Sequence, residues 1–321
     1  MRKLFLLFGV GLSFISCFLN AQDTWLNRAA YPGGSIYNGV AASVGGKGYL
    51  GLGYRTAPTV ANNQAFYEYN PTTNTWAIKA NFPIASRHLA VAFSIGTKVY
   101  VGTGNSAAIP TTAGNYSDFW EYDPATNIWT AKASLPAAAR CRAVGFSANG
   151  KGYIGLGTNG LLSYNDLWEY NPATNAWTQK ANFPGAARHS ASVFVINNIA
   201  YVGGGLNATS IGQIDFYKYN PATNAWIAIS SMPSSGYKRG AFAIGPNGYV
   251  TVGYASTVLS TITYKYASTA NAWTTVLSFP STLREAVCGF DVNGKGYIGT
   301  GLNGTAGIND LWEYTSINDI G

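Results

Sequence analysis

The chain has 321 residues, enough for one large domain or two ordinary ones, and a formal net charge of +7. Only 10% of its residues are charged, against roughly 25% in typical soluble domains. The basic residues are scattered, with neither a basic stripe nor a recognised nucleic-acid-binding module, which argues against nucleic-acid binding. The 38 glycines and the 14% of aromatic residues suit many short strands joined by tight turns.

The first 21 residues have the layout of a secretory signal peptide. Arg2 and Lys3 precede an almost wholly apolar run, residues 4–18, and the small residue Ala21 marks the expected cleavage site. The run is short for a membrane span, which needs roughly 20 residues. Cleavage would leave residues 22–321 as the mature domain and, by removing two basic residues, lower the net charge from +7 to +5. We therefore expect a secreted, periplasmic or cell-surface protein with no transmembrane span.

The cysteines allow two further readings of an exported chain. Phe14-Ile15-Ser16-Cys17 loosely resembles a bacterial lipobox, so a lipoprotein anchored through Cys17 is an alternative. An exported protein could also join Cys141 and Cys288 in a disulfide. The repeats described below place these two cysteines on opposite sides of the fold, so we expect both to be free and buried.

One signature, a Trp followed by a Pro seven residues later, recurs along the chain at intervals of about 50 residues. It is found at Trp25/Pro32, Trp76/Pro83, Trp129/Pro136, Trp177/Pro184, Trp226/Pro233 and Trp273/Pro280. Six identical offsets in one chain are very unlikely by chance, so the chain is built from tandem repeats.

Each repeat predicts four short strands in a fixed order. After the Pro comes an apolar strand, as at residues 89–95, and then a two-residue turn such as Asn149-Gly150, whose residues accept positive φ. The second strand begins with Tyr and runs into glycines, as at 153–157. A loop of variable length leads to an aromatic third strand, as at 167–170. A proline turn, residues 171–175, then leads to the next Trp and the fourth strand.

Four short antiparallel strands in each repeat of about 50 residues are typical of a β-propeller blade. The glycine-rich second strand, the aromatic third strand and the Trp resemble kelch repeats over residues 23–314. Kelch glycines usually form an adjacent pair, and only Gly204-Gly205 keeps both here, while the other repeats keep the second glycine. The resemblance implies a kelch-type propeller over residues 22–321, similar to those of galactose oxidase and the sialic acid mutarotases.

The two ends of the repeat array predict how the ring closes. The last repeat ends at its third strand, residues 311–314, and no Trp follows it. The first Trp, Trp25, has no third strand before it. We therefore expect an all-β, six-bladed propeller of four-stranded antiparallel blades, in which residues 23–28 supply the outer strand of blade six.

Arginines and aspartates occupy matching positions in four repeats. Four residues after the Pro, blades two, three, four and six carry Arg87, Arg140, Arg188 and Arg284. Three residues before the Glu or Lys of the third strand, the same blades carry Asp118, Asp166, Asp215 and Asp310. Blades one and five lack both, with Ile36 and Tyr237 at the first position and Ala65 and Ile262 at the second. This pattern predicts a structural Arg–Asp pair in four blades. The alternative is a cationic ring that captures an anionic ligand such as an acidic sugar.

The position after the arginines differs from blade to blade, and such positions can carry function on a symmetric scaffold. It reads Tyr37, His88, Cys141, His189, Lys238 and Glu285, and Arg142 and Arg239 follow closely without an obvious acidic partner in sequence. Our candidate ligand-binding residues at one mouth of the central channel are Tyr37, His88, Arg142, His189, Lys238, Arg239 and Glu285. The alternative is that these side chains pack between neighbouring blades.

No metal or cofactor is expected from these residues. His88 and His189 belong to blades two and four, which are too far apart for metal–ligand bonds of about 2 Å. Kelch-type copper oxidases use paired Tyr and His ligands, and this chain has only two histidines. The best acid–base candidate is Glu285, beside Arg284, and we regard it as a weak candidate for a catalytic residue.

Two functions of different classes fit these observations. The first is an exported, non-catalytic binding or interaction propeller, which takes a polar ligand, a glycan or a protein at the channel mouth or on loops such as 54–64 and 105–116. The second is a carbohydrate-active enzyme, such as a sialic-acid-type mutarotase or epimerase, because Glu285 stands close to Arg142, Lys238 and Arg239. A structural surface protein, or part of a longer protein that continues beyond Gly321, is a further alternative.

Overall fold

The computed structural model of the chain describes residues 22–57, 61–107 and 112–316. The predicted signal peptide, residues 1–21, and Cys17 within it lie outside the described residues. In the described ranges the chain is all-β and contains no helix. Those ranges therefore hold no helix long and apolar enough to cross a membrane.

The described residues form six sheets of four antiparallel strands, which we number along the chain, joined by turns and loops. Sheet one contains β3 (Val40–Val44), β4 (Lys47–Gly51), β7 (Phe66–Asn70) and β8 (Thr75–Lys79), and sheet two contains β9 (Val91–Ile95), β10 (Lys98–Gly102), β11 (Phe119–Asp123) and β12 (Ile128–Lys132). Sheet three contains β13 (Val144–Ala148), β14 (Lys151–Gly155), β15 (Leu167–Asn171) and β16 (Ala176–Lys180), and sheet four contains β18 (Ser192–Ile196), β19 (Ile199–Gly203), β21 (Phe216–Asn220) and β22 (Ala225–Ile229). Sheet five contains β24 (Gly240–Ile244), β25 (Asn247–Thr251), β28 (Thr263–Ala267) and β29 (Ala272–Val276), and sheet six contains β30 (Cys288–Val292), β31 (Lys295–Gly299), β34 (Leu311–Thr315) and β1 (Thr24–Arg28).

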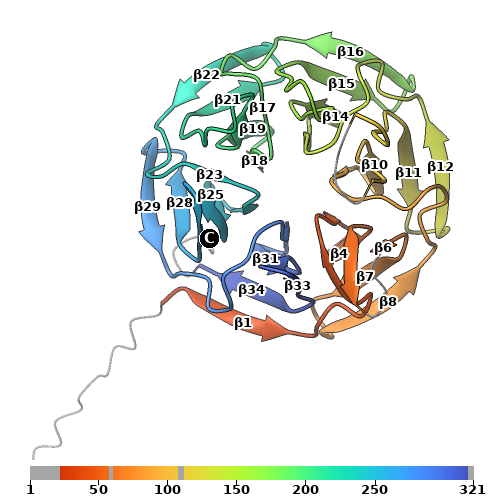
Figure 1. Cartoon of the computed structure of the whole chain (residues 1–321), viewed down its shortest axis with the longest axis horizontal. Coiled ribbons are helices and arrows are strands. Elements are labelled where there is room, and N and C mark those ends of the chain that lie inside the picture. The colour runs from red at the N-terminus through yellow and green to blue at the C-terminus, as the bar shows by residue number, and fades with distance from the viewer. Residues whose placement is uncertain (1–21, 58–60, 108–111, 317–321) are drawn as a thin grey trace, which may run out of the picture.

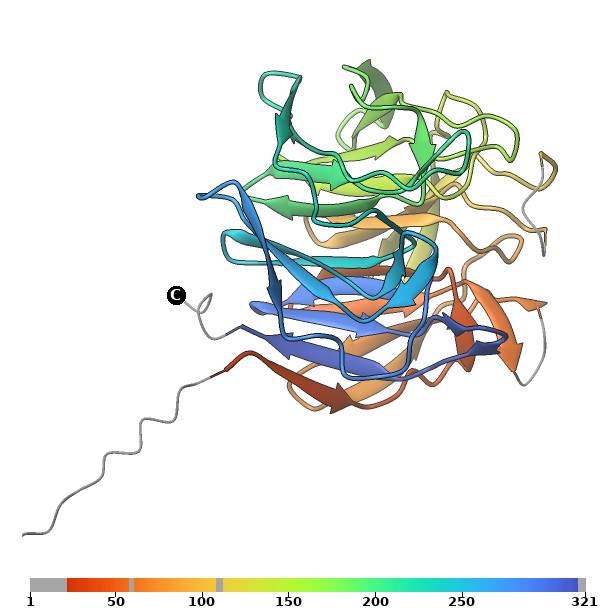
Figure 2. The ribbon, with the colours of Figure 1, turned by 60° about the vertical axis from the view of Figure 1, so that its left-hand side comes forward.

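The remaining strands are short and flank the first and second strands of the sheets. They are β2 (Ser35–Tyr37), β5 (Tyr54–Ala57), β6 (Ala61–Asn62), β17 (Arg188–His189), β20 (Leu206–Asn207), β23 (Gly236–Tyr237), β26 (Gly253–Ala255), β27 (Val258–Ser260), β32 (Leu302–Asn303) and β33 (Ala306–Gly307). In the side view of Figure 2, short strands and loops of this kind project on one face of the molecule. We call this face the loop face.

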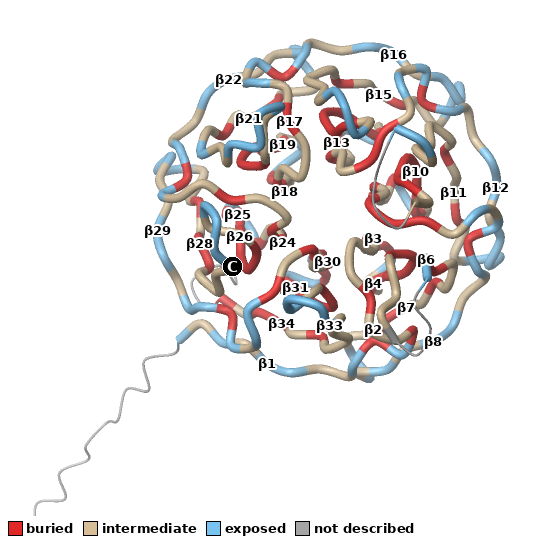
Figure 3. Tube along the Cα trace, viewed as in Figure 1, coloured by how far each residue is buried: buried red, intermediate tan, exposed pale blue. Residues whose placement is uncertain are grey.

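The sheets are arranged around a common centre, with the first strand of each sheet innermost and the fourth outermost (Figure 1). A cavity of about 200 Å³ lined by the first strands of all six sheets lies at this centre. The first strand β9 alternates buried and half-buried residues, the second strand β10 is buried after its first residue, and the fourth strand β12 is mostly exposed. Exposed residues are therefore concentrated on the outer strands (Figure 3).

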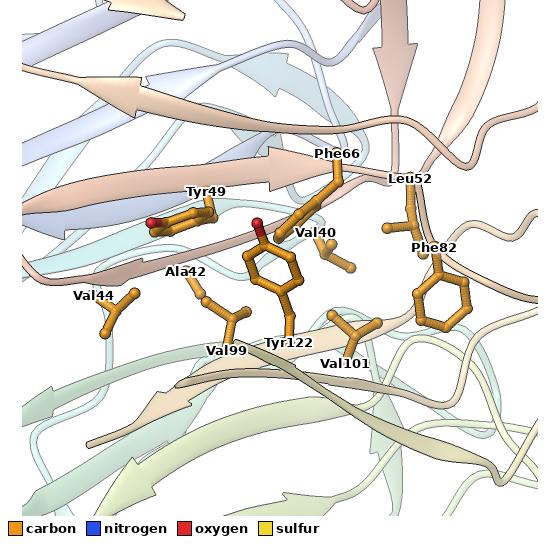
Figure 4. Close-up of a cluster of buried hydrophobic side chains, with 10 residues drawn as sticks. All are labelled: Val40, Ala42, Val44, Tyr49, Leu52, Phe66, Phe82, Val99, Val101 and Tyr122. Atoms are coloured by element: carbon orange, nitrogen blue, oxygen red, sulfur yellow. The ribbon is translucent and has the colours of Figure 1, made fainter. Parts of the chain in front are cut away.

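Neighbouring sheets share their apolar faces. Between sheets one and two, Val40 and Phe66 from one side meet Val99, Val101 and Tyr122 from the other, and all five are buried (Figure 4). Full burial of each such side chain contributes about 1.5–3 kcal/mol relative to exposure. Each core therefore lies between two repeats, and a single repeat cannot bury its faces alone.

The glycine that ends the second strand makes room for a large side chain on the third. A Cβ atom on Gly102 would lie 2.7 Å from the ring of Phe119. Sheet five has a different contact at this place. Thr251 stands where the other sheets have the glycine, and Thr263 stands where they have the large side chain. Their hydroxyl oxygens lie 2.7 Å apart in a buried hydrogen bond.

An Asn-x-Trp motif ties five of the six outer strands to the preceding sheet. The indole N–H of Trp129 donates to the carbonyl of Ala80 at 2.9 Å. The side-chain oxygen of Asn127 accepts from the N–H of Ala80 and from the hydroxyl of Tyr122. The same three contacts recur at Asn74/Trp76, Asn175/Trp177, Asn224/Trp226 and Asn271/Trp273.

The N-terminal strand β1 is the fourth strand of sheet six and pairs antiparallel with β34 along its whole length. Arg28 donates to the buried carboxylate of Glu313 through Nε and Nη2, at 2.9 and 2.7 Å. The Trp25 ring packs edge-on against Phe279, and its N–H donates to the carbonyl of Leu277. Asp23 therefore begins a segment that makes the same kind of contacts as the other outer strands.

A closed cycle of backbone hydrogen bonds joins the inner ends of the six sheets. Each N–H donates to the carbonyl of the equivalent residue in the adjacent sheet, at 2.9–3.2 Å. The cycle runs Asn38 to Ala286, Ala286 to Lys238, Lys238 to Ser190, Ser190 to Arg142, Arg142 to Leu89 and Leu89 to Asn38. All six residues have positive φ, between 52° and 58°, which non-glycine residues adopt uncommonly. The cycle fixes which residues of the six sheets are structurally equivalent.

Candidate functional site

The structure corrects the predicted alignment of sheet five. Tyr237 pairs with Tyr254 as His88 pairs with Asn105, so Tyr237 and not Lys238 occupies the position next to the arginines. Gly236 therefore stands at the arginine position. The prediction was wrong by one residue because the segment after the Pro of this repeat is one residue shorter. Lys238 consequently joins Arg142 in the hydrogen-bonded cycle.

The four predicted arginine and aspartate pairs are brought together. In sheet two, Arg87 is fully buried and donates through Nη1 and Nη2 to both oxygens of Asp118, at 2.5 and 3.0 Å. Its Nη1 also donates to the carbonyl of Thr103, and its guanidinium lies 3.9 Å from the centre of the Tyr116 ring. The corresponding pairs are Arg140–Asp166, Arg188–Asp215 and Arg284–Asp310. These guanidinium groups are occupied by protein partners, so an anionic ligand would have to displace a carboxylate.

His88 and His189 are held neutral by their surroundings. Burial lowers the pKa of His88 to about 4, and the nearby Arg142 acts in the same direction. Its Nδ1 lies 2.6 Å from the side-chain oxygen of Asn62. Burial also lowers the pKa of His189 to about 4, helped by Arg142 and Lys238. Arg142 is thus close to both imidazoles.

Cys141 and Cys288 are both free and buried, as the repeat layout predicted. Burial raises the pKa of each thiol to about 11. Among the described residues, no group of three or more His, Cys, Asp or Glu side chains is placed to hold a metal ion.

Three cations lie at the loop-face end of the central channel, which we call the mouth. Arg142, Lys238 and Arg239 line a cavity of about 120 Å³ there, together with the other residues of the hydrogen-bonded cycle. Lys238 donates to Glu285 at 2.7 Å, and the Glu285 side chain is 13% exposed. The Nε of Arg142 is buried and has no hydrogen-bond partner within the described ranges. Arg142 therefore keeps one guanidinium donor at the mouth without a partner among the described residues.

A second cavity, of about 210 Å³, lies between the loops of sheets three and four. Arg142 lines it as well as the mouth, and His189 lines it beside Arg142. The other polar residues that line it are Thr158, Ser163, Asn207 and Ser210. This cavity thus offers hydroxyl and amide groups around one guanidinium.

Tyrosines lie around Glu285, beside the mouth, a feature that the sequence reasoning missed except for Tyr37. Tyr237 and Tyr254 stack with ring centroids 4.5 Å apart and an angle of 8°. Tyr37 packs on Tyr54 at 5.5 Å. Burial raises the pKa of Tyr37, Tyr237 and Tyr254, and Glu285 adds to each shift. Glu285 therefore lies among these rings.

Arg239, a predicted mouth residue, contributes only part of its side chain there. A Cβ atom on Gly236 would lie 2.1 Å from Nε of Arg239, and one on Gly253 would lie 2.6 Å from its Cγ. Its Nε donates to the carbonyl of Tyr254 at 2.8 Å. The guanidinium group is thus turned into sheet five and away from a ligand in the channel.

The fold and the repeats define a kelch-repeat propeller. The family model described as KLHDC2/KLHL20/DRC7 Kelch-repeats domain matches residues 38–253, more than half of the chain. The chain therefore belongs to this kelch-repeat family.

Two individual proteins show the extent of the likeness. The chain is 28% identical over 171 residues to N-acetylneuraminate epimerase of Pasteurella multocida (strain Pm70). That match covers 43% of this chain and 45% of the relative, so it spans less than half of the relative's length. A solved structure titled "Structure of YjhT" superposes with a TM-score of 0.75 and 17% identity, over 88% of this chain and 95% of the other. That superposition shows a shared fold.

Proposed function

We propose that the chain is a six-bladed propeller, closed by its N-terminal strand, which is exported and binds a carbohydrate that carries a negative charge. The pairing of β1 with β34 and the closed backbone cycle support the six-bladed ring. The apolar run at residues 4–18 with the small residue Ala21 supports export. The carbohydrate site is the mouth and the adjoining cavity between sheets three and four.

The single observation that carries the ligand class is that stacked aromatic rings and cations lie close together at the loop-face end of the channel. Pyranose rings present apolar C–H faces, which pack on aromatic rings such as the stacked Tyr237 and Tyr254. A sugar carboxylate pairs well with a guanidinium, and Arg142 has an unpaired buried Nε at the same mouth. The name of the relative, N-acetylneuraminate epimerase, supports a sugar acid as the ligand.

Calorimetric titration with N-acetylneuraminate tests this proposal, with its methyl ester as the uncharged control. A hydrogen bond to a charged group contributes about 1.5–3 kcal/mol. Arg142→Met should therefore weaken binding of the acid about 10- to 100-fold and leave binding of the ester nearly unchanged. Lys151→Met, which removes a positive charge on β14 far from the mouth, serves as the matched control. Failure of the acid and of a panel of other acidic sugars to bind would contradict the proposal.

A second candidate is a mutarotase or epimerase with Glu285 as its acid–base group. The observation in its favour is that this carboxylate lies at the mouth, is 13% exposed and accepts from Lys238 at 2.7 Å. Exchange between the anomers of the bound sugar can be followed by NMR. A catalyst would accelerate exchange, and Glu285→Gln would abolish the acceleration. A purely binding protein would leave the exchange rate at the value measured without protein.

A further inference from the structure

Sheet five contains a buried arginine that lacks an acidic partner among the described residues. Arg239 is 7% exposed. Its Nη1 and Nη2 atoms are buried and have no hydrogen-bond partner in the part of the chain that the structure describes. A guanidinium group carries five N–H donors. Only the Nε donor is paired, with the carbonyl of Tyr254.

The four paired sheets show what is missing in sheet five. In sheet six, Arg284 donates through Nη1 and Nη2 to Asp310 and through Nη1 to the carbonyl of Thr300. At the equivalent positions sheet five has Gly236 and Ile262, so it provides neither the arginine nor the carboxylate. The Arg239 side chain fills the space beside Gly236 instead. Arg239 thus places a guanidinium group near the arginine position of sheet five, but Ile262 supplies no carboxylate to pair with it.

Arg239 remains positively charged at neutral pH. Burial lowers its pKa to about 10, and Tyr264, whose ring centroid lies 5.5 Å from the guanidinium, opposes this shift. The group is therefore protonated in the folded protein under ordinary conditions. A buried charge without a partner is strongly destabilising, so a counter-ion at Nη1 and Nη2 would stabilise the sheet.

We propose that a small inorganic anion of the chloride class binds to Nη1 and Nη2 of Arg239 and takes the role that aspartate has in the other sheets. A monatomic anion suits the site because both nitrogens are shielded from solvent. The site adjoins the mouth, whose cavity Arg239 also lines, but its two nitrogens face sheet five, where Nε donates to the carbonyl of Tyr254. An ordered water molecule at the two nitrogens is the competing occupant.

Thermal unfolding of the purified protein tests the proposal when chloride replaces gluconate at constant ionic strength. An anion that binds only the folded state raises Tm, and we expect a rise of about 1–2 °C, because the unfolding entropy of a chain of this size is large. Ile262→Asp supplies a permanent carboxylate and should abolish the response to chloride while keeping or raising Tm in gluconate. Arg239→Met should also lose the response, and Lys151→Met should respond like the wild type.

Two results would overturn the proposal. One is a wild-type Tm that is the same in both anions, and the other is an equal chloride response in the wild type and in Ile262→Asp. Should Arg239→Met fail to fold, the comparison with Ile262→Asp still decides. Crystals grown in bromide provide a direct measurement, because bromide within hydrogen-bonding distance of Nη1 or Nη2 gives an anomalous peak. A fully occupied position without anomalous signal would identify a water molecule and contradict the proposal.

Discussion

The backbone N–H of Asn38 donates to the carbonyl of Ala286 at 2.9 Å and joins the first repeat to the last. Both residues have positive φ, and each makes a second bond of the same kind to its other neighbour. The contact therefore links the two ends of the repeat array near the channel, while β1 links them at the outer edge. The seam between the N- and C-terminal repeats thus has an inner and an outer connection.

The outer connection should depend strongly on Trp25. We predict that Trp25→Ala destabilises the protein by about 3 kcal/mol, because the ring packs on Phe279 and Tyr314. Chemical denaturation measures the change. Leu26→Ala is the matched control on the same strand, since Leu26 is 50% exposed, and it should change stability by less than about 0.5 kcal/mol. Equal effects of the two substitutions would show that β1 does not brace the seam.

The buried Arg–Asp pairs should contribute more to the stability of the fold than ion pairs at the surface do. Asp118→Asn leaves the fully buried Arg87 without its carboxylate, and we predict a loss of about 3–5 kcal/mol. Asp123→Asn breaks the more exposed pair between Lys98 and Asp123, and it should change stability far less than Asp118→Asn does. Denaturation of both variants under identical conditions gives the comparison. A loss at Asp118 as small as that at Asp123 would contradict a bracing role.

The sequence was most informative where the repeats agree. The Trp spacing predicted four-stranded units, and the shared absence of Arg and Asp from repeats one and five predicted which residues pair. An additional signal was present but unused: Asp23-Thr24-Trp25 matches the Asn-x-Trp motif of the other outer strands. Its carboxylate accepts from the Tyr314 hydroxyl, as the asparagines accept from the equivalent tyrosines.

The candidate site was less predictable because it lies where the repeats differ in length. A segment one residue shorter shifted Lys238 and Tyr237 relative to their counterparts, and counting from Pro233 could not reveal this. The direction of Arg239 depends on space left by Gly236, which only the packed structure shows. Tyr54 and Tyr254 directly follow Gly53 and Gly253, two residues beyond the second strand, and this placement was the available signal for the aromatic rings beside the mouth.

The two histidines should make the protein less stable in mild acid. Their pKa values are lowered to about 4 in the folded state, against about 6.5 in an unfolded chain. The unfolded state therefore binds more protons between these values, so the free energy of unfolding should fall as pH decreases from about 6.5 to 4. Urea denaturation across this range tests the sign. The double variant His88→Gln, His189→Gln should lose less stability over the same interval, and an unchanged slope would assign the effect to other groups.

The reactivity of the two buried thiols reports how often the structure around each of them opens to solvent. Cys141 and Cys288 are buried, and burial raises their pKa to about 11, so little reactive thiolate exists at neutral pH. We predict that a thiol reagent modifies neither residue in the native protein at pH 7.5, whereas both react in urea. Mass spectrometry of peptides containing each cysteine follows the two sites separately. Faster labelling of Cys288 in Trp25→Ala, with Cys141 unchanged, would place the first opening at the seam, because Cys288 begins the first strand of sheet six. Equal acceleration at both cysteines would instead indicate that the ring opens as a whole.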